Sequence, residues 1–81
     1  MNTNILVVDD DKEIVDAIEI YLIQEGFGVI KAYDGEEALK KLKEHDIHLI
    51  LLDIMMPKLD GYEVTKEIRR SSDVPIIMLT A

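Results

Sequence analysis

The sequence contains no cysteine, so neither a disulfide framework nor a thiolate metal site is possible. Basic residues are also scarce, because 9 Lys and Arg stand against 17 Asp and Glu and give a formal net charge of −8. This charge argues against a domain that grips nucleic acid or anionic lipid. It is compatible with a bound cation or with a basic partner.

Long apolar runs are missing as well. No stretch approaches the length of a membrane span, and no basic residue precedes Ile5. We therefore expect a soluble, cytoplasmic protein with no membrane partner. The 81 residues allow one small domain, and 48% apolar with 32% charged residues is typical of a globular chain.

Short apolar runs alternate with segments of helical periodicity. Strands are expected at 5–8, 27–32, 47–52 and 75–79, and helices at about 12–25, 35–44 and 61–70. Asp34 and Glu37 form a capping-box pattern, and Gly26 is a candidate C-cap. The inward positions expected on the helices are Ile14, Ala17, Ile18, Tyr21 and Leu22, then Ala38, Leu39 and Leu42, then Val64 and Ile68. The βαβαβαβ order predicts a layered α/β domain with a parallel sheet.

Polar side chains follow the apolar strands at the points where they end. Asp9 and Asp10 follow the first strand, Asp53 follows 49–52, and Thr80 follows the last strand. The 49–52 run is expected to be buried on both faces, so an acid directly after it needs a cation or a proton as compensation. Ligand sites in parallel sheets lie at the carboxyl ends of the strands.

Several carboxylates in one pocket repel each other, and oxygen-only ligands favour a hard cation such as Mg²⁺. Such a site suits a phosphoryl group. A carboxylate can then act as the nucleophile and form an acyl phosphate, and Thr80 could donate its hydroxyl to a phosphoryl oxygen.

Simpler interpretations exist for each residue alone. Asp10 and Asp11 could be helix caps and nothing more, and Asp60 with Glu63 is most simply another cap. His45 and His48 are expected to be solvated residues beside a helix–strand turn, and Met55 and Met56 are expected to contribute packing. It is the joint spacing of the acids that favours a functional site.

Taken together, the motifs resemble the receiver domain of two-component response regulators. The resemblance covers the whole chain and rests on Val7-Val8-Asp9-Asp10-Asp11, on the segment from Asp53 to Pro57 with Asp60-Gly61 after it, and on the segment from Pro75 to Ala81. It implies a flavodoxin-like (βα)₅ fold, with strand order 2-1-3-4 in the part present here. It further implies that a sensor histidine kinase phosphorylates Asp53.

The resemblance also assigns roles around Asp53. Mg²⁺ would be held by Asp9, Asp10, Asp53 and the backbone carbonyl of Met55, and the Thr80 hydroxyl would sense the phosphoryl group. The protein would be a phosphoacceptor switch rather than an enzyme, although family receivers catalyse their own phosphorylation and dephosphorylation. Regulators with a winged-helix DNA-binding domain are the most similar class, which implies transcription regulation by the full-length protein and no DNA contact by the receiver.

The sequence departs from the family in length. We expect residues 1–81 to be a receiver that is incomplete at its C-terminus, without the fourth helix, the fifth strand, the fifth helix and the lysine that follows strand five. The segment 76–79 would then be an apolar edge strand, through which the chain is expected to self-associate. An inactive, self-associating fragment is therefore the alternative to a working phosphoacceptor.

Two other classes fit less well. A phosphotransferase of the haloacid-dehalogenase type needs a second acid two residues after the nucleophile, where this chain has Met55. A flavin-binding module needs a hydroxyl- or glycine-rich loop after the first strand, where three acids would repel a phosphate.

Overall fold

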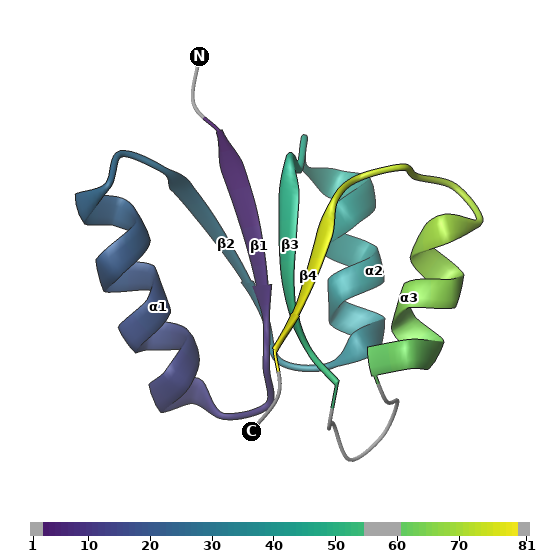
Figure 1. Ribbon diagram of the computed structural model, residues 1–81, viewed down its shortest axis with the longest axis horizontal. Helices are drawn as coiled ribbons and strands as arrows, with labels where there is room; N and C mark the ends of the chain where they lie inside the picture. Colours follow the sequence, from purple (N-terminus) through teal and green to yellow (C-terminus); the bar gives the residue numbers. More distant parts are fainter. Residues whose placement is uncertain (1–2, 55–60, 80–81) are drawn as a thin grey trace.

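The computed structural model describes residues 3–54 and 61–79, and these form a four-stranded parallel sheet with three helices. The strands pair in the order β2-β1-β3-β4 (Figure 1). The expected flavodoxin-like α/β fold and its strand order 2-1-3-4 are therefore confirmed. The elements in chain order are β1 (Asn4–Val8), α1 (Lys12–Gln24), β2 (Gly28–Ala32), α2 (Gly35–Glu44), β3 (Leu49–Asp53), α3 (Gly61–Arg69) and β4 (Ile76–Leu79).

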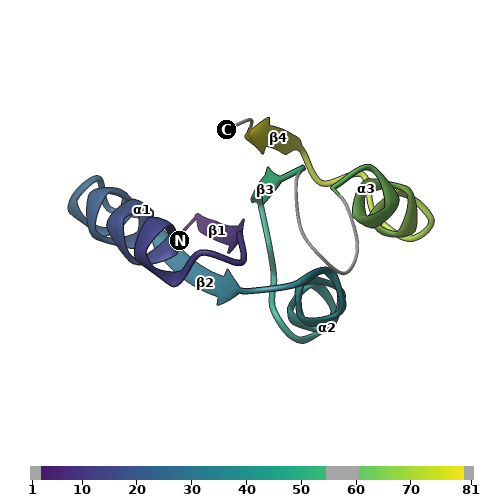
Figure 2. The same cartoon turned by 90° about the horizontal axis from the view of Figure 1, so that it is seen from below.

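The helices cover the sheet unequally. Helix α1 lies alone on one face, while α2 and α3 lie side by side on the other (Figure 2). The larger core cluster is on the α2–α3 side and includes Leu6, Ile50 and Leu52, all fully buried. On the α1 side the buried cluster is small, consisting of Ile5, Val7 and Val15. No described helix has the length and apolar character that a membrane crossing requires.

The helix ends follow the sequence signals closely. The Asp34 side chain accepts a hydrogen bond from the Glu37 N–H at 2.7 Å, as expected for an N-cap. Glu37 reaches one residue further back than a standard capping box, because its Oε1 accepts from the Tyr33 N–H at 2.9 Å. Gly26 follows α1 with a φ of 92°, a left-handed conformation that favours glycine.

The expected inward face of α1 was wrong in part. Val15 is its one buried residue and Ile18 and Leu22 pack beside it, whereas Ile14, Ala17 and Tyr21 are exposed. Helix α1 carries apolar side chains on all its sides, so the periodicity of the sequence alone does not identify the side that packs on the sheet. On α2 and α3 the expected inward residues are confirmed.

The expected burial of β3 on both faces was also wrong in part. Ile50 and Leu52 are buried beneath α2 and α3, but Leu49 and Leu51 face the α1 side and are only half-buried. Contacts of α1 are to β1 and β2, so this helix leaves β3 and β4 partly uncovered. Strand β3 also starts at Leu49 rather than at Ile47, which packs against the core from the preceding turn.

Candidate metal and phosphoryl site

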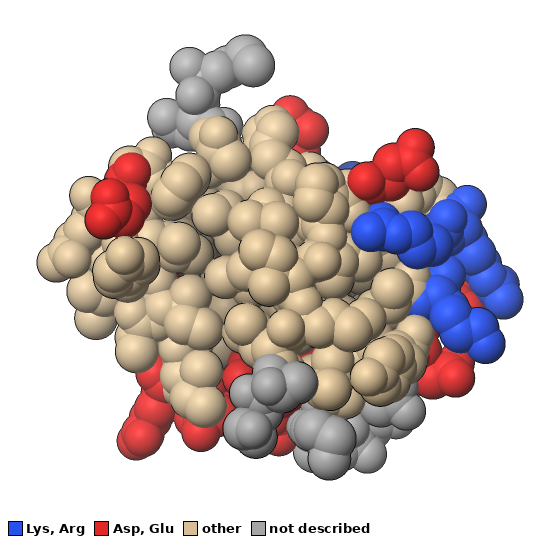
Figure 3. All heavy atoms as spheres, in the orientation of Figure 1, with Lys and Arg blue, Asp and Glu red and all other residues tan. Residues whose placement is uncertain are grey.

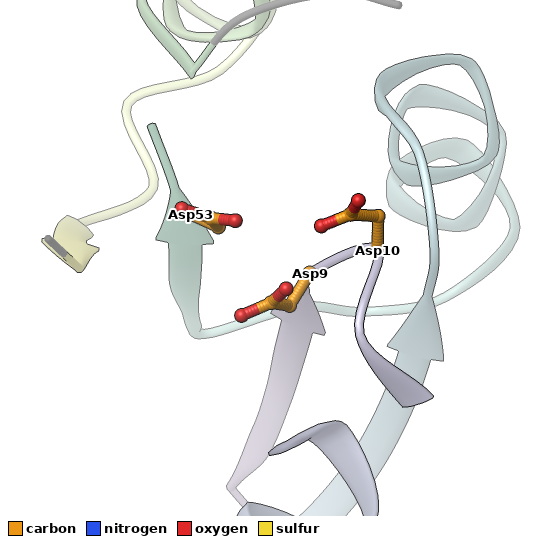
Figure 4. A group of neighbouring side chains, drawn as sticks. All are labelled: Asp9, Asp10 and Asp53. Atoms are coloured by element: carbon orange, nitrogen blue, oxygen red, sulfur yellow. The ribbon is translucent and has the colours of Figure 1, made fainter. Parts of the chain in front are cut away.

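Three carboxylates meet at the carboxyl end of the sheet. Asp9 and Asp10 follow β1 and Asp53 is the last residue of β3, the strand that pairs with β1. One oxygen from each of the three side chains lies within 4.8 Å of the others (Figure 4). The sequence predicted that these acids would share one edge of the sheet, and the structure places them close enough to hold one ion together.

Asp9 is the deepest of the three, with only 6% of its surface exposed. Its N–H donates to the Ala32 carbonyl at 3.2 Å, which extends the pairing of β1 with β2 by one residue. Its Oδ1 accepts a hydrogen bond from the Asp11 N–H at 3.0 Å. These two bonds fix the backbone where the chain turns from β1 into α1, so the Asp9 carboxylate is held in place.

The environment of Asp9 opposes its ionisation. Burial raises the pKa of this carboxyl above its ordinary value, and the neighbouring Asp53 and Asp10 raise it further. The Asp11 N–H acts in the opposite direction but does not cancel the effect of burial. A cation between these oxygens would relieve the same unfavourable terms.

Asp11 has a different role from Asp9 and Asp10. Its side chain accepts from the N–H groups of Glu13 at 3.0 Å and Ile14 at 3.4 Å, so Asp11 is the N-cap of α1. The structure thus contradicts the simpler interpretation in which Asp10 only caps this helix. Asp10 is left exposed, with its side chain directed toward the cluster (Figure 4).

The backbone of Gly61, at the start of α3, lies very close to the end of β3. The Gly61 N–H donates to the Ile54 carbonyl at 3.0 Å. A Cβ atom at Gly61 would lie 2.4 Å from the Ile54 Cα and 2.9 Å from the Asp53 carbonyl oxygen. A residue with a Cβ atom would clash at this position. The glycine therefore allows the start of α3 to pack directly on the end of β3. Sequence reasoning assigned Gly61 only to a helix start, and the Asp60-Gly61 pair was the signal that could have suggested this contact.

Two residues of the predicted site, Met55 and Thr80, lie outside the described residues, as do Met56 and Asp60. The backbone carbonyl of Met55 and the hydroxyl of Thr80 therefore stay predictions. So do the individual roles of Asp9, Asp10 and Asp53, whose juxtaposition is nonetheless a structural fact.

The raised pKa of Asp9 predicts how stability depends on pH. In the unfolded chain this carboxyl titrates near its model value of 3.8, so between that pH and the higher folded pKa the folded state binds more protons. The contribution of Asp9 to stability is present below pH 3.8 and is lost as the pH rises through the folded pKa.

Asp9→Asn keeps an oxygen for the Asp11 N–H but removes the buried charge that its neighbours repel, so it should raise the free energy of unfolding at pH 7 in metal-free buffer. The gain should shrink as the pH falls toward 4. Urea unfolding at several pH values measures it, with the exposed Asp73→Asn as the control. A gain that is independent of pH, or no gain at all, would contradict this electrostatic account.

Comparisons with known proteins place this chain in a family. Residues 5–81 match the family model described as the response regulator receiver domain. The chain is 54% identical over 78 residues to a probable transcriptional regulator ycf27 of Cyanidium caldarium. It is 52% identical over 82 residues to the alkaline phosphatase synthesis transcriptional regulatory protein PhoP of Bacillus subtilis. These matches cover 96% and 100% of this chain but only 31% and 34% of the relatives.

Solved structures agree with this assignment. The response regulator TrrA from Thermotoga maritima, crystallised in complex with Mg²⁺-BeF, superposes with a TM-score of 0.91 at 45% identity and covers 98% of this chain and 70% of that one. The chemotaxis protein CheY4 of Vibrio cholerae gives a TM-score of 0.93 at 33% identity, over 96% of this chain and 68% of that one. The two curated relatives named above are described as transcriptional regulators, one of them as probable, and this chain belongs to the response regulator receiver domain family of two-component systems.

Proposed function

We propose that this receiver accepts a phosphoryl group on Asp53 from a sensor histidine kinase, with Mg²⁺ bound beside it. The observation that carries the proposal is the convergence of three carboxylate oxygens within 4.8 Å at the end of a parallel sheet. Three carboxylates this close together repel one another, and Asp9 among them is buried, so the arrangement favours a role in binding or chemistry.

The donor set fits Mg²⁺. All the ligands offered by the described residues are oxygens, and Asp9, Asp10 and Asp53 would hold the ion, together with the Met55 carbonyl. When bound, Mg²⁺ supplies positive charge that offsets the negative charge of a phosphoryl group and of the acids around it. The structural neighbour TrrA was crystallised with Mg²⁺-BeF, which supports the same ligand class for this chain.

We assign the nucleophile to Asp53, as the resemblance to receiver domains implies, and the structure makes Asp9 a poorer candidate. Asp9 is buried, and one of its oxygens already accepts a backbone hydrogen bond, whereas Asp53 is only partly covered. In the proposed step an Asp53 carboxylate oxygen attacks the phosphorus of phosphohistidine. The phosphorus–nitrogen bond breaks, and the imidazole leaves with the bonding electron pair and takes up a proton. The product is an acyl phosphate on Asp53, next to which the Thr80 hydroxyl would donate to a phosphoryl oxygen.

The output of such a switch lies outside this domain. The chain spans about a third of the length of its curated relatives, which are transcriptional regulators. We propose that residues 1–81 supply the first four strands and three helices of a cytoplasmic receiver. A DNA-binding domain of the full-length protein would carry out transcription regulation. The acidic receiver itself would make no direct contact with DNA.

The direct test is incubation with Mg²⁺ and acetyl phosphate, followed by intact-mass measurement. Here the phosphorus–oxygen bond of the donor breaks and acetate leaves. We expect one phosphoryl group per chain, lost in Asp53→Asn and when EDTA removes the metal, and retained in the remote control Asp73→Asn. No phosphoryl gain with Mg²⁺ and donor present, or an equal gain in Asp53→Asn, would overturn the proposal.

A second proposal concerns self-association, which the exposed apolar surface favours. Strand β4 is an edge of the described sheet, and Ile77 on it is 50% exposed. Because Ile77 is in register with Leu51, it shares the α1-side face of the sheet with that half-buried residue. Ile14 and Tyr21 of α1 are also exposed, at 45% and 63%. Charged side chains lie mainly at the margins of the face shown in Figure 3, which leaves a broad uncharged centre.

We propose that a second copy of the chain covers this surface or pairs with β4. Sedimentation velocity over a range of concentrations tests it. Wild type should form dimers, and Ile77→Lys should weaken dimerisation about tenfold or more, since a charge would have to be buried. Ser71→Lys is the control with the same charge change at another exposed site. A monodisperse monomer at every concentration would refute self-association.

A further inference from the structure

His48 is an exposed residue in the loop before β3, as the sequence predicted, and it is also hydrogen-bonded to the first strand. Its ring Nδ1 accepts a hydrogen bond from the backbone N–H of Asn4 at 3.0 Å. The backbone N–H of His48 donates in return to the Asn4 carbonyl at 2.9 Å. The ring therefore extends the pairing of β1 with the segment before β3 by one bond, at the end of the sheet opposite the acids.

Asn4 contacts both neighbouring segments, the turn before β3 and the start of β2. Its Nδ2 donates to the Asp46 carbonyl at 2.9 Å. On the other side, Gly28 approaches so closely that a Cβ there would lie 2.4 Å from the Asn4 Oδ1. The Gly28 N–H also donates to the Thr3 carbonyl at 2.9 Å. Residues 3 and 4 are thus fixed between the start of β2 and the turn before β3.

The hydrogen bond dictates the protonation state of the ring. A backbone N–H can only donate, so Nδ1 must present a lone pair and the ring proton must be on Nε2. Nε2 lies 3.5 Å from the Asp46 Oδ2, to which its proton is attracted. Within the described residues Asp46 is the ionisable group at ion-pair distance from the ring, and Asn4, which faces Nδ1 from β1, carries no charge.

We propose that the hydrogen bond from the Asn4 N–H to the His48 ring holds the start of β1 in place and is broken when the ring is protonated. An imidazolium ring has two donors and no acceptor, so protonation at Nδ1 places a donor against the Asn4 N–H. The ring must then turn away, and the exposed Asp46 carboxylate can keep it paired after it leaves. Protonation releases the Asn4 N–H to water while the rest of the sheet stays paired. This proposal is independent of phosphorylation at Asp53.

Nuclear magnetic resonance can follow this hydrogen bond at both of its residues, His48 and Asn4. Above pH 8 the ring nitrogens of His48 should show the tautomer with the proton on Nε2. Imidazole titrates near pH 6.5 in model peptides, so a titration from about pH 8 to pH 5 covers the change. The Asn4 amide proton should shift with the same midpoint as the His48 ring. Its hydrogen exchange, corrected for the intrinsic pH dependence, should speed up about fivefold as the bond is lost.

Two variants complete the design. In His48→Asn the side-chain oxygen can replace Nδ1 as an acceptor that does not titrate, so the pH response of the Asn4 amide should disappear. His45→Asn removes the other histidine and should leave the response unchanged. An Asn4 amide that ignores the His48 titration, or a ring proton on Nδ1 above pH 8, would overturn the proposal. The tautomer measurement needs only the wild type, so it decides even if a variant does not fold.

Discussion

The mutual repulsion of three carboxylates at one end of the sheet is the constraint on which the functional part of this structure depends. Asp9 is buried, and its pKa is raised by that burial and by Asp53 and Asp10, so the protein alone disfavours the charged form of this carboxyl. A parallel sheet brings such residues together because its strands all end at the same edge. The chain belongs to the receiver family, and the proposed cation would offset the repulsion within this cluster.

The rest of the fold holds the cluster rigidly. Buried Val8 and Leu52 lie beside each other in register, one residue before Asp9 and Asp53, so the core fixes the separation of the two acids. Asp11 caps α1 and its N–H orients Asp9, while Gly61 lets α3 begin directly against the end of β3. The opposite end of the sheet is tied by Asn4 and His48, far from the acids in the fold. The two ends are therefore built from different kinds of interaction.

Much of this could be predicted from the sequence because the relevant signals are local. Apolar runs ending in Asp9 and Asp53 predict both the strands and the edge at which the acids meet, and Asp34 with Glu37 predicts the start of α2. The rest depends on contacts between distant segments. The inward side of α1 could not be chosen because the helix is apolar nearly all round, and Val15 was missed. The steric role of Gly61 and the bond from Asn4 to His48, 44 residues apart, exist only once the sheet has formed.

The most direct measurement of the central claim is thermal unfolding in MgCl₂ against NaCl of equal ionic strength. If the three carboxylates act as one cation site, Mg²⁺ will raise the Tm in a saturable way beyond the effect of NaCl, because a ligand that binds only the folded state stabilises it. The excess should vanish in Asp10→Asn, which removes an exposed ligand without disturbing the core. Identical Tm values in the two salts would contradict the account, since the acids would then be neighbours that do not cooperate in binding.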